Sequence, residues 1–241
     1  MMEYMTEDYA SLQKRFTETL KLSTVPVAIS FRDTAPADVP KLEGSQPSGC
    51  SFWRLAAHGR TFYTVPADHH NCPIGCYTHN ISLPPQREHE LMGTVSLMVQ
   101  IGYLKEEEVP GIARLAKSPA FTMYSPLSEA TATPDVVLIV GQPGKLMLLQ
   151  EAALRAGIGC DSSLMARPTC MAIPVAMTSG LAASTGCIGN RVYTELGDDE
   201  LYIAVPGAAL GKLAEALDTI VAANAQLAAY HQQRRQELTA E

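Results

Sequence analysis

The sequence has little charge and few basic residues. Only 18% of its 241 residues are charged, and the formal net charge is −7. The basic clusters are small, such as Gln-Gln-Arg-Arg near the end. A nucleic-acid-binding surface needs a stripe of Lys and Arg to meet the phosphates. We therefore expect no nucleic-acid partner.

Long apolar runs are also lacking, and the first residues do not resemble a secretory signal. The longest apolar runs, "PDVVLIV" and "IPVAM", are far shorter than the roughly 20 residues that a membrane-spanning helix needs. The first residues, "MMEYMTEDYASLQKRF", have neither the basic start nor the apolar stretch of a secretory signal. We expect no membrane association and a cytoplasmic location, where thiols stay reduced.

Several motifs that announce a known chemistry are absent. The sequence has no C-x2-C or H-x3-H pair of a structural zinc site, no C-x2-C-x2-C run of a ferredoxin and no G-x-S-x-G elbow of a hydrolase. The segment "GQPGK" lacks the G-x4-G-K-[ST] spacing of a phosphate-binding loop. These absences leave open whether the protein is an enzyme.

Hydrophobic periodicity predicts a mixed α/β fold. Helices are expected at residues 5–22, 50–59, 88–104, 106–118, 145–157 and from 207 to about 230. Strands are expected at 25–31, 60–65, 134–141 and 198–206, and loops at 33–49 and 67–80. We predict an α/β (or α+β) class: one compact domain over residues 1–241 with a mixed sheet, flanking helices and a polar, fraying tail at 231–241. The two halves could be a pseudo-repeat.

What the sequence does have is six cysteines, four of them in turn-forming surroundings. Cys50 follows "PSG", Cys72 lies in "NCPIG", Cys170 in "RPTC" and Cys187 in "TGCIGNR". A Pro or Gly nearby turns the backbone, which leaves amide N–H groups free to face the sulfur. Iron–sulfur clusters need this arrangement, because thiolates bind the iron and N–H donors stabilise the negative charge. We expect these four cysteines to bind one [4Fe–4S] cluster for electron transfer, redox sensing or redox chemistry on a small anion.

Polar residues beside these cysteines are candidates for the surroundings of the cluster. The histidines could tune the metal, and the arginines could offer donors to an anionic cluster. Each also has a plain structural role open to it: a loop hydrogen bond, a surface ion pair or, for the asparagine, a turn. The candidates are His69, His70, Arg167, Asn190 and Arg191.

The remaining two cysteines are weaker candidates. Free cysteine often behaves as a small buried hydrophobe, and we expect that role for Cys76 and Cys160. Cys76 could still be a fifth thiol near the site, since Cys72-x3-Cys76 falls within the looser range of zinc spacings.

Two other kinds of function fit the same residues. One is a binding protein for haem, a related tetrapyrrole or a soft metal ion such as zinc, and the other is a metal-free enzyme with one activated cysteine. A redox partner protein or a small-molecule ligand would then be the partner. The alanine-rich final helix suits a homo-oligomer interface and an intramolecular core equally well.

Four blocks of the sequence resemble a known family. They are "CSFWRLAAHGRTFYTVPADHHNCPIG", "PDVVLIVGQPGKLMLLQEA", "RPTC" and "GCIGNRVYTELGDDELYIAVPGAAL". Together they resemble the prokaryotic family known as domain of unknown function 169, over about residues 8–225. The resemblance implies a soluble, cytoplasmic α/β domain in which Cys50, Cys72, Cys170 and Cys187 fall on family motif positions. It implies no substrate or reaction.

Overall fold

The fold is built on one sheet of seven strands. The computed structural model describes residues 8–239, and its strands lie in the order β2-β3-β1-β4-β7-β6-β5. Only β5 and β6 pair in parallel; every other neighbouring pair is antiparallel. The strands are β1 (Val27–Arg32), β2 (Phe62–Thr64), β3 (Phe121–Pro126), β4 (Val136–Gly141), β5 (Cys160–Met165), β6 (Leu181–Ser184) and β7 (Leu201–Pro206). The predicted mixed sheet with flanking helices is confirmed.

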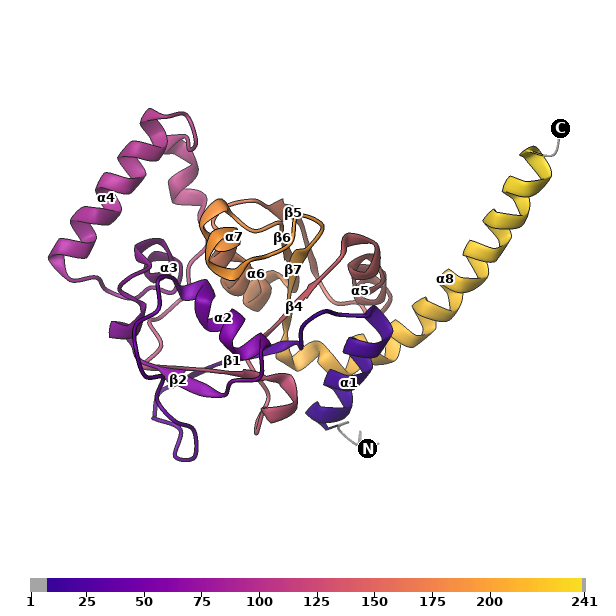
Figure 1. The fold of residues 1–241 in the computed structure, drawn as a ribbon, viewed down its shortest axis with the longest axis horizontal. Coiled ribbons are helices and arrows are strands. Elements are labelled where there is room, and N and C mark those ends of the chain that lie inside the picture. Colours follow the sequence, from indigo (N-terminus) through magenta and orange to yellow (C-terminus); the bar gives the residue numbers. More distant parts are fainter. Residues whose placement is uncertain (1–7, 240–241) are drawn as a thin grey trace.

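Both faces of the sheet are buried, because alternate strand residues point to opposite sides. In β4, Val136 and Leu138 pack into one core, whereas Val137 and Ile139 pack into the other. The continuous apolar run "VVLIV" is the sequence signature of such a doubly covered strand. The result is a three-layer arrangement with helices on each side of the sheet (Figure 1).

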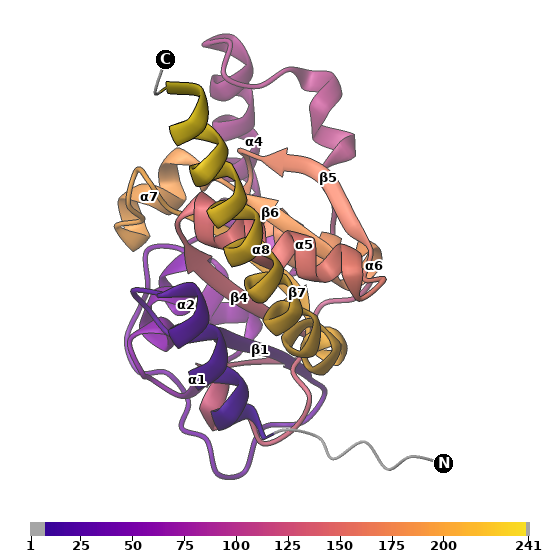
Figure 2. The same ribbon diagram turned by 90° about the vertical axis from the view of Figure 1, so that its right-hand side faces the viewer.

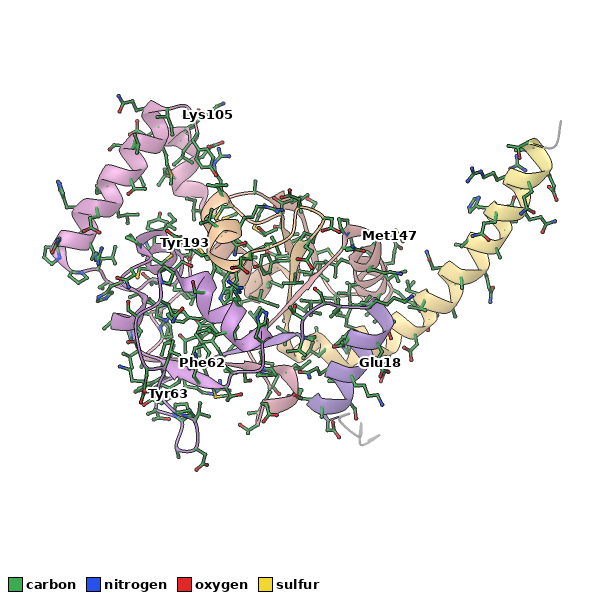
Figure 3. The ribbon with its side chains drawn as sticks, in the orientation of Figure 1. Glu18, Phe62, Tyr63, Lys105, Met147 and Tyr193 are labelled. Carbon is green, nitrogen blue, oxygen red and sulfur yellow. The ribbon has the colours of Figure 1, made fainter. Side chains whose placement is uncertain are left out.

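One side of the sheet, which we call the hydrocarbon face, is covered by α1 (Tyr9–Leu20), α5 (Pro143–Arg155) and α8 (Leu210–Thr239). Figure 2 shows these three helices together in front of the strands. Its core consists of Leu, Ile, Val, Ala and Phe side chains. Glu18 on α1 and Met147 on α5 lie on the solvent side of this layer (Figure 3).

The other side, which we call the cysteine face, is covered by α2 (Gly49–Ala57) and α6 (Ala172–Ser179), and its core includes Cys50 and Cys170. The short helices η1 (Pro66–His69), α3 (Pro73–Thr78), η4 (Thr169–Met171) and α7 (Ile188–Thr194) complete this layer. Phe62, labelled in Figure 3, belongs to its core, and Tyr193 lies on the exposed side of α7.

Two helical segments extend away from the body (Figure 1). One is α4 (Pro85–Gln100), which buries none of its residues and leads into η2 (Glu106–Gly111). The other is the second part of α8, where residues 222–239 are all exposed. Two further 3₁₀ turns follow strands of the sheet: η3 (Leu127–Glu129) lies between β3 and β4, and η5 (Gly207–Ala209) lies between β7 and α8. Within residues 8–239, no helix combines the length and apolarity that crossing a membrane requires.

Several predicted elements need correction. The predicted loop 67–80 contains η1 and α3, and the predicted helix 106–118 is only the short η2, because Pro110 and Gly111 stop it. The predicted tail at 231–241 is helical through Thr239, since no Gly or Pro interrupts α8 after Gly211. Strands β3, β5 and β6 and helices α6 and α7 were not predicted. Residues 5–7 of the predicted first helix lie outside the described residues.

Candidate functional site

The four cysteines singled out in the sequence all lie where a helix begins. Cys50 is the second residue of α2, and Cys170 lies in η4, which runs directly into α6. Cys72 immediately precedes α3, and Cys187 immediately precedes α7. The first residues of a helix have backbone N–H groups without partners inside the helix. Backbone N–H groups act on two of the four sulfurs, those of Cys72 and Cys170.

The four thiols are also close to one another. Burial, followed by the charges of Cys170, Cys72 and Cys187, raises the pKa of the Cys50 thiol well above its ordinary value. Burial and then Cys72 likewise raise the pKa of Cys170. Cys50 and Cys170 are 7% and 6% exposed, while Cys72 and Cys187 are partly exposed. The site thus runs from the interior of the cysteine face to its surface.

Directed donors surround these sulfurs. The backbone N–H groups of Gly49 and Gly75 hydrogen-bond to the Cys72 sulfur and oppose the effect of burial on its pKa. Gly75 has to be a glycine for this approach, since a Cβ there would lie 2.9 Å from the Cys72 Sγ. The Thr78 side chain likewise opposes the effect of burial on the pKa of Cys170, and its hydroxyl donates to the carbonyl of Gly75 at 3.0 Å.

A threonine connects two of the cysteine segments. The backbone N–H of Cys187 donates to Thr169 Oγ1 at 2.6 Å, and Thr169 is fully buried. This bond ties the start of α7 to η4, which carries Cys170. Thr169 therefore fixes the position of one candidate ligand relative to another.

The other two cysteines have different surroundings. Cys76 is fully buried and its thiol donates to the carbonyl of His69, with Sγ···O 3.2 Å. Burial, followed by the charge of Cys72, raises the pKa of Cys76 to about 12. Cys160 lies in β5, where its thiol contacts the carbonyl of Ile158 at 3.7 Å. Cys76 is thus a neighbour of the site with a hydrogen bond of its own, and Cys160 lies elsewhere.

His69 is buried behind the cysteines. Its Nε2 lies 2.8 Å from Thr64 Oγ1, and its ring meets Phe52 edge-on at a centroid distance of 4.8 Å. Its carbonyl accepts the backbone N–H of Cys72 at 2.9 Å. Burial, followed by the charges of His79 and His70, lowers the pKa of His69 to about 3. It is therefore neutral at physiological pH and braces the Cys72 segment through its main chain, whereas His70 is partly exposed.

Asn190 reaches the site directly. It is 2% exposed, its side-chain amide hydrogen-bonds to the Cys50 sulfur, and its Nδ2 lies 3.4 Å from the hydroxyl of Tyr202. Its Oδ1 has no partner in the part of the chain that the structure describes. Of the polar residues proposed from the sequence, Asn190 is the one with a side-chain hydrogen bond to a candidate ligand.

The two arginines hold other parts of the structure. Arg167 forms an ion pair with Glu108 at 3.0 Å, and its guanidinium lies 4.9 Å from the centre of the Tyr103 ring. It thus connects the segment before Cys170 with the end of the α4 extension. Arg191 donates to the carbonyls of Thr185 and Gly197 at 2.6 and 3.0 Å. It braces the loops on either side of α7.

Sequence reasoning missed three groups near the sulfurs, namely Thr78, Thr169 and Tyr124. Burial raises the pKa of Tyr124, and the charges of Cys50 and Cys72 raise it further. Tyr124 belongs to β3, which was not predicted, although the alternation in "FTMYSP" is a strand signal. Thr169 lies directly before Cys170, but nothing in its spacing indicates that it contacts Cys187.

The four thiols do not form a ready-made site for a single ion. Within residues 8–239, no group of three or more His, Cys, Asp or Glu side chains is arranged to hold one metal ion. A tetrahedral zinc site with Zn–S bonds of about 2.3 Å would place its sulfurs about 3.8 Å apart. The thiols of the described residues are not arranged in this way.

Comparison with known proteins gives a family and no activity. One relative, named "Uncharacterized protein MJ0308", from Methanocaldococcus jannaschii, is 25% identical over 217 residues, which cover 85% of this chain and 91% of that protein. No solved structure matches the chain. The model of family DUF169, described as "Uncharacterised ArCR, COG2043", matches residues 15–216. The chain belongs to this family.

Proposed function

We propose that this protein binds one [4Fe–4S] cluster through Cys50, Cys72, Cys170 and Cys187. The cluster would serve electron transfer, redox sensing or redox chemistry on a small anion. The observation that carries the proposal is the convergence of four thiols, two from each half of the chain, at the starts of four helices. Helical starts and glycine N–H groups provide the donors that anionic clusters require.

The number of thiols matches the four ligands of a four-iron cluster. A four-iron cluster places iron and sulfide between its thiolates, so its ligands lie farther apart than the ligands of one ion. In addition, three of these thiols, those of Cys170, Cys72 and Cys187, act on the pKa of the fourth, Cys50.

The protonation of the thiols favours a metal over a free cysteine nucleophile. Thiol catalysis needs a thiolate, which a nearby cation or an adjacent base stabilises. Here burial raises the pKa of Cys50 and Cys170, and their further neighbours are other thiols. Bound iron would supply the missing positive charge, because a coordinating thiol is deprotonated by the metal itself.

The test is anaerobic purification or reconstitution, followed by iron, sulfide and zinc analysis with a visible spectrum. We expect about four irons and four acid-labile sulfides per chain and a broad brown absorbance. A sharp Soret band would indicate haem instead. Zinc alone, or no metal after reconstitution, would overturn the cluster proposal.

Trp53, the only tryptophan, gives an independent readout. It lies one helical turn after Cys50, and its ring packs edge-on against Tyr202 at 5.7 Å. A cluster absorbs broadly across the near ultraviolet and visible, so loading should quench the fluorescence of Trp53. Quenching that rises in proportion to bound iron would show that the iron is bound within energy-transfer distance of Trp53.

Matched cysteine variants test the ligand assignment. Cys50→Ala and Cys170→Ala should abolish stable cluster binding, whereas Cys76→Ala and Cys160→Ala should retain it. Cys76 is the most stringent control, because it is buried close to Cys72. Its thiol, however, donates a hydrogen bond to the carbonyl of His69. Loss of iron in Cys76→Ala, with retention in Cys50→Ala, would mean that the ligand set is wrong.

The physiological setting follows from the same chemistry. A reduced cytoplasm suits free thiols and labile clusters, so we place the protein there. Its partner would be a redox protein or a small molecule. The partly exposed Cys72 and Cys187 are where such a partner would come closest to the cluster.

A further inference from the structure

We propose that the Tyr124 hydroxyl donates a hydrogen bond to the cluster, at a cysteine or sulfide sulfur, and thereby raises its reduction potential. This inference rests on the proposed function and assigns Tyr124 a positioning and tuning role there. It does not make Tyr124 a metal ligand.

The ring of Tyr124 is held rigidly on the cysteine face. Tyr124 is fully buried, and its ring stacks on Phe62 at a centroid distance of 5.5 Å and an interplanar angle of 28°. Phe52, two residues after Cys50, lies 5.5 Å away on α2. An aromatic side chain packed in this way has little freedom to redirect its hydroxyl.

The hydroxyl itself has no partner. Tyr124 Oη is completely buried and makes no hydrogen bond within the described residues. Buried tyrosine hydroxyls normally find a partner, because leaving one unpaired costs free energy. The Tyr124 ring lies between two segments that carry candidate ligands: it is 5.5 Å from the ring of Phe52, two residues after Cys50, and 6.5 Å from that of His69, three residues before Cys72. An unpaired donor beside two candidate ligands is accounted for if the cluster provides its acceptor.

The direction of the effect follows from charge. A phenol keeps its proton at neutral pH, so the Tyr124 hydroxyl acts as a donor. Reducing a cluster adds negative charge, and a donor to its sulfurs stabilises the reduced form more than the oxidised form. Removing the donor should therefore make the potential more negative.

The variant that tests this is Tyr124→Phe, reconstituted beside the wild type and titrated anaerobically with dithionite and redox mediators. We expect four irons to be retained, as in the wild type, and the potential to shift to a more negative value. In the metal-free protein the same variant should unfold at the same temperature as the wild type or a higher one, because a buried unpaired hydroxyl is gone.

Ser125→Ala is the matched control. Ser125 is the next residue of β3, and its hydroxyl is also buried without a partner in the described chain. Strand alternation turns it away from the cysteine face, so its loss should leave the potential unchanged.

The outcomes separate the two proposals. If the wild type takes up no cluster, the proposed function fails and this inference fails with it. If the wild type loads normally and Tyr124→Phe has the wild-type potential, only the role of Tyr124 is overturned. An equal shift in Tyr124→Phe and Ser125→Ala would also overturn it, because the effect would then be a general response of β3.

Discussion

The two faces of the sheet share the same strands but bury different chemistry. The hydrocarbon face is filled by aliphatic side chains from α1, α5 and α8. The cysteine face buries His69, His79 and Asn190 together with Cys50 and Cys170. Buried polar groups cost free energy unless they are paired, whereas buried hydrocarbon stabilises the fold. The hydrocarbon face therefore contributes most to the stability of the fold. The cysteine face contributes less stability, because it buries the polar groups of the candidate site.

The largest expected effect is a loss of stability when a buried side chain of the hydrocarbon face is truncated. Leu149 on α5 is fully buried in the hydrocarbon face. Leu149→Ala should lower the free energy of unfolding by about 2–5 kcal/mol, because it leaves a cavity. Iron per folded chain should not change. Urea denaturation and iron analysis of the folded fraction measure both quantities.

A substitution on the cysteine face should have the opposite pattern, with a small effect on stability and a large effect on iron content. Cys170→Ala removes one heavy atom, so it should cost the metal-free protein only about 1 kcal/mol. Its iron should be lost. If Leu149→Ala lost iron while folded, the division between the faces would be wrong.

The second expected effect is a pH dependence that arises on the cysteine face. Burial lowers the pKa of His69 to about 3 and of His79 to about 4. In the unfolded chain both groups titrate near 6.5, so below that pH the unfolded state binds more protons than the folded state. Stability is then complete above pH 6.5 and declines by about 1.4 kcal/mol per pH unit for each histidine as the pH falls toward 4.

Urea midpoints of the metal-free protein at pH 7, 6 and 5 check this slope. His79→Gln should roughly halve it, because only His69 then titrates with a lowered pKa. Leu149→Ala should lower every midpoint without altering the slope, since its defect lies on the hydrocarbon face. A wild-type stability that is constant between pH 6.5 and 5 would contradict the prediction.

The sequence predicted the hydrocarbon face better than the cysteine face. Helical periodicity located α1, α5 and α8, and the runs "VVLIV" and "LYIAV" located β4 and β7. Helices with one apolar face and strands buried on both faces each carry a strong apolar pattern. The β5–α6–β6 segment was missed. In the structure Ser162, Ser163 and Leu164 in β5 are exposed at the sheet edge, so this strand has no apolar alternation to detect.

The candidate site could be predicted by residue type but not by contact. Turn residues beside Cys50, Cys72, Cys170 and Cys187 indicated free backbone donors, and the four cysteines do lie at helix starts. The partners are long-range: Asn190 meets Cys50, and Thr78 meets Cys170. Such contacts depend on the whole fold, which local patterns do not encode.

A smaller effect compares two glycines within the cysteine face. The N–H groups of Gly49 and Gly75 both face the Cys72 sulfur. A Cβ on Gly75 would crowd that sulfur at 2.9 Å, whereas a Cβ on Gly49 meets nothing within 4 Å. Gly75→Ala should reduce cluster occupancy and cost about 1–2 kcal/mol through overpacking.

Gly49→Ala is the control for this pair. It should keep full iron and change stability by about 0.5 kcal/mol or less. Iron analysis and urea denaturation of the two variants side by side give the answer. If the two variants bound equal amounts of iron per chain, the close approach of Gly75 to Cys72 would not be needed for cluster binding.

The smallest expected effects concern exposed ion pairs at the edges of the two faces, which should contribute equally little to stability. On the hydrocarbon side Arg15 holds Asp218 through two bonds of 3.2 and 2.6 Å, and on the cysteine side Arg54 pairs with Glu195. Both carboxylates are mostly exposed, so Asp218→Asn and Glu195→Gln should each cost less than about 1 kcal/mol, and less still at high salt. Urea denaturation at low and high ionic strength measures this. If either variant lowered the free energy of unfolding by more than about 2 kcal/mol, exposed ion pairs as well as buried side chains would distinguish the two faces.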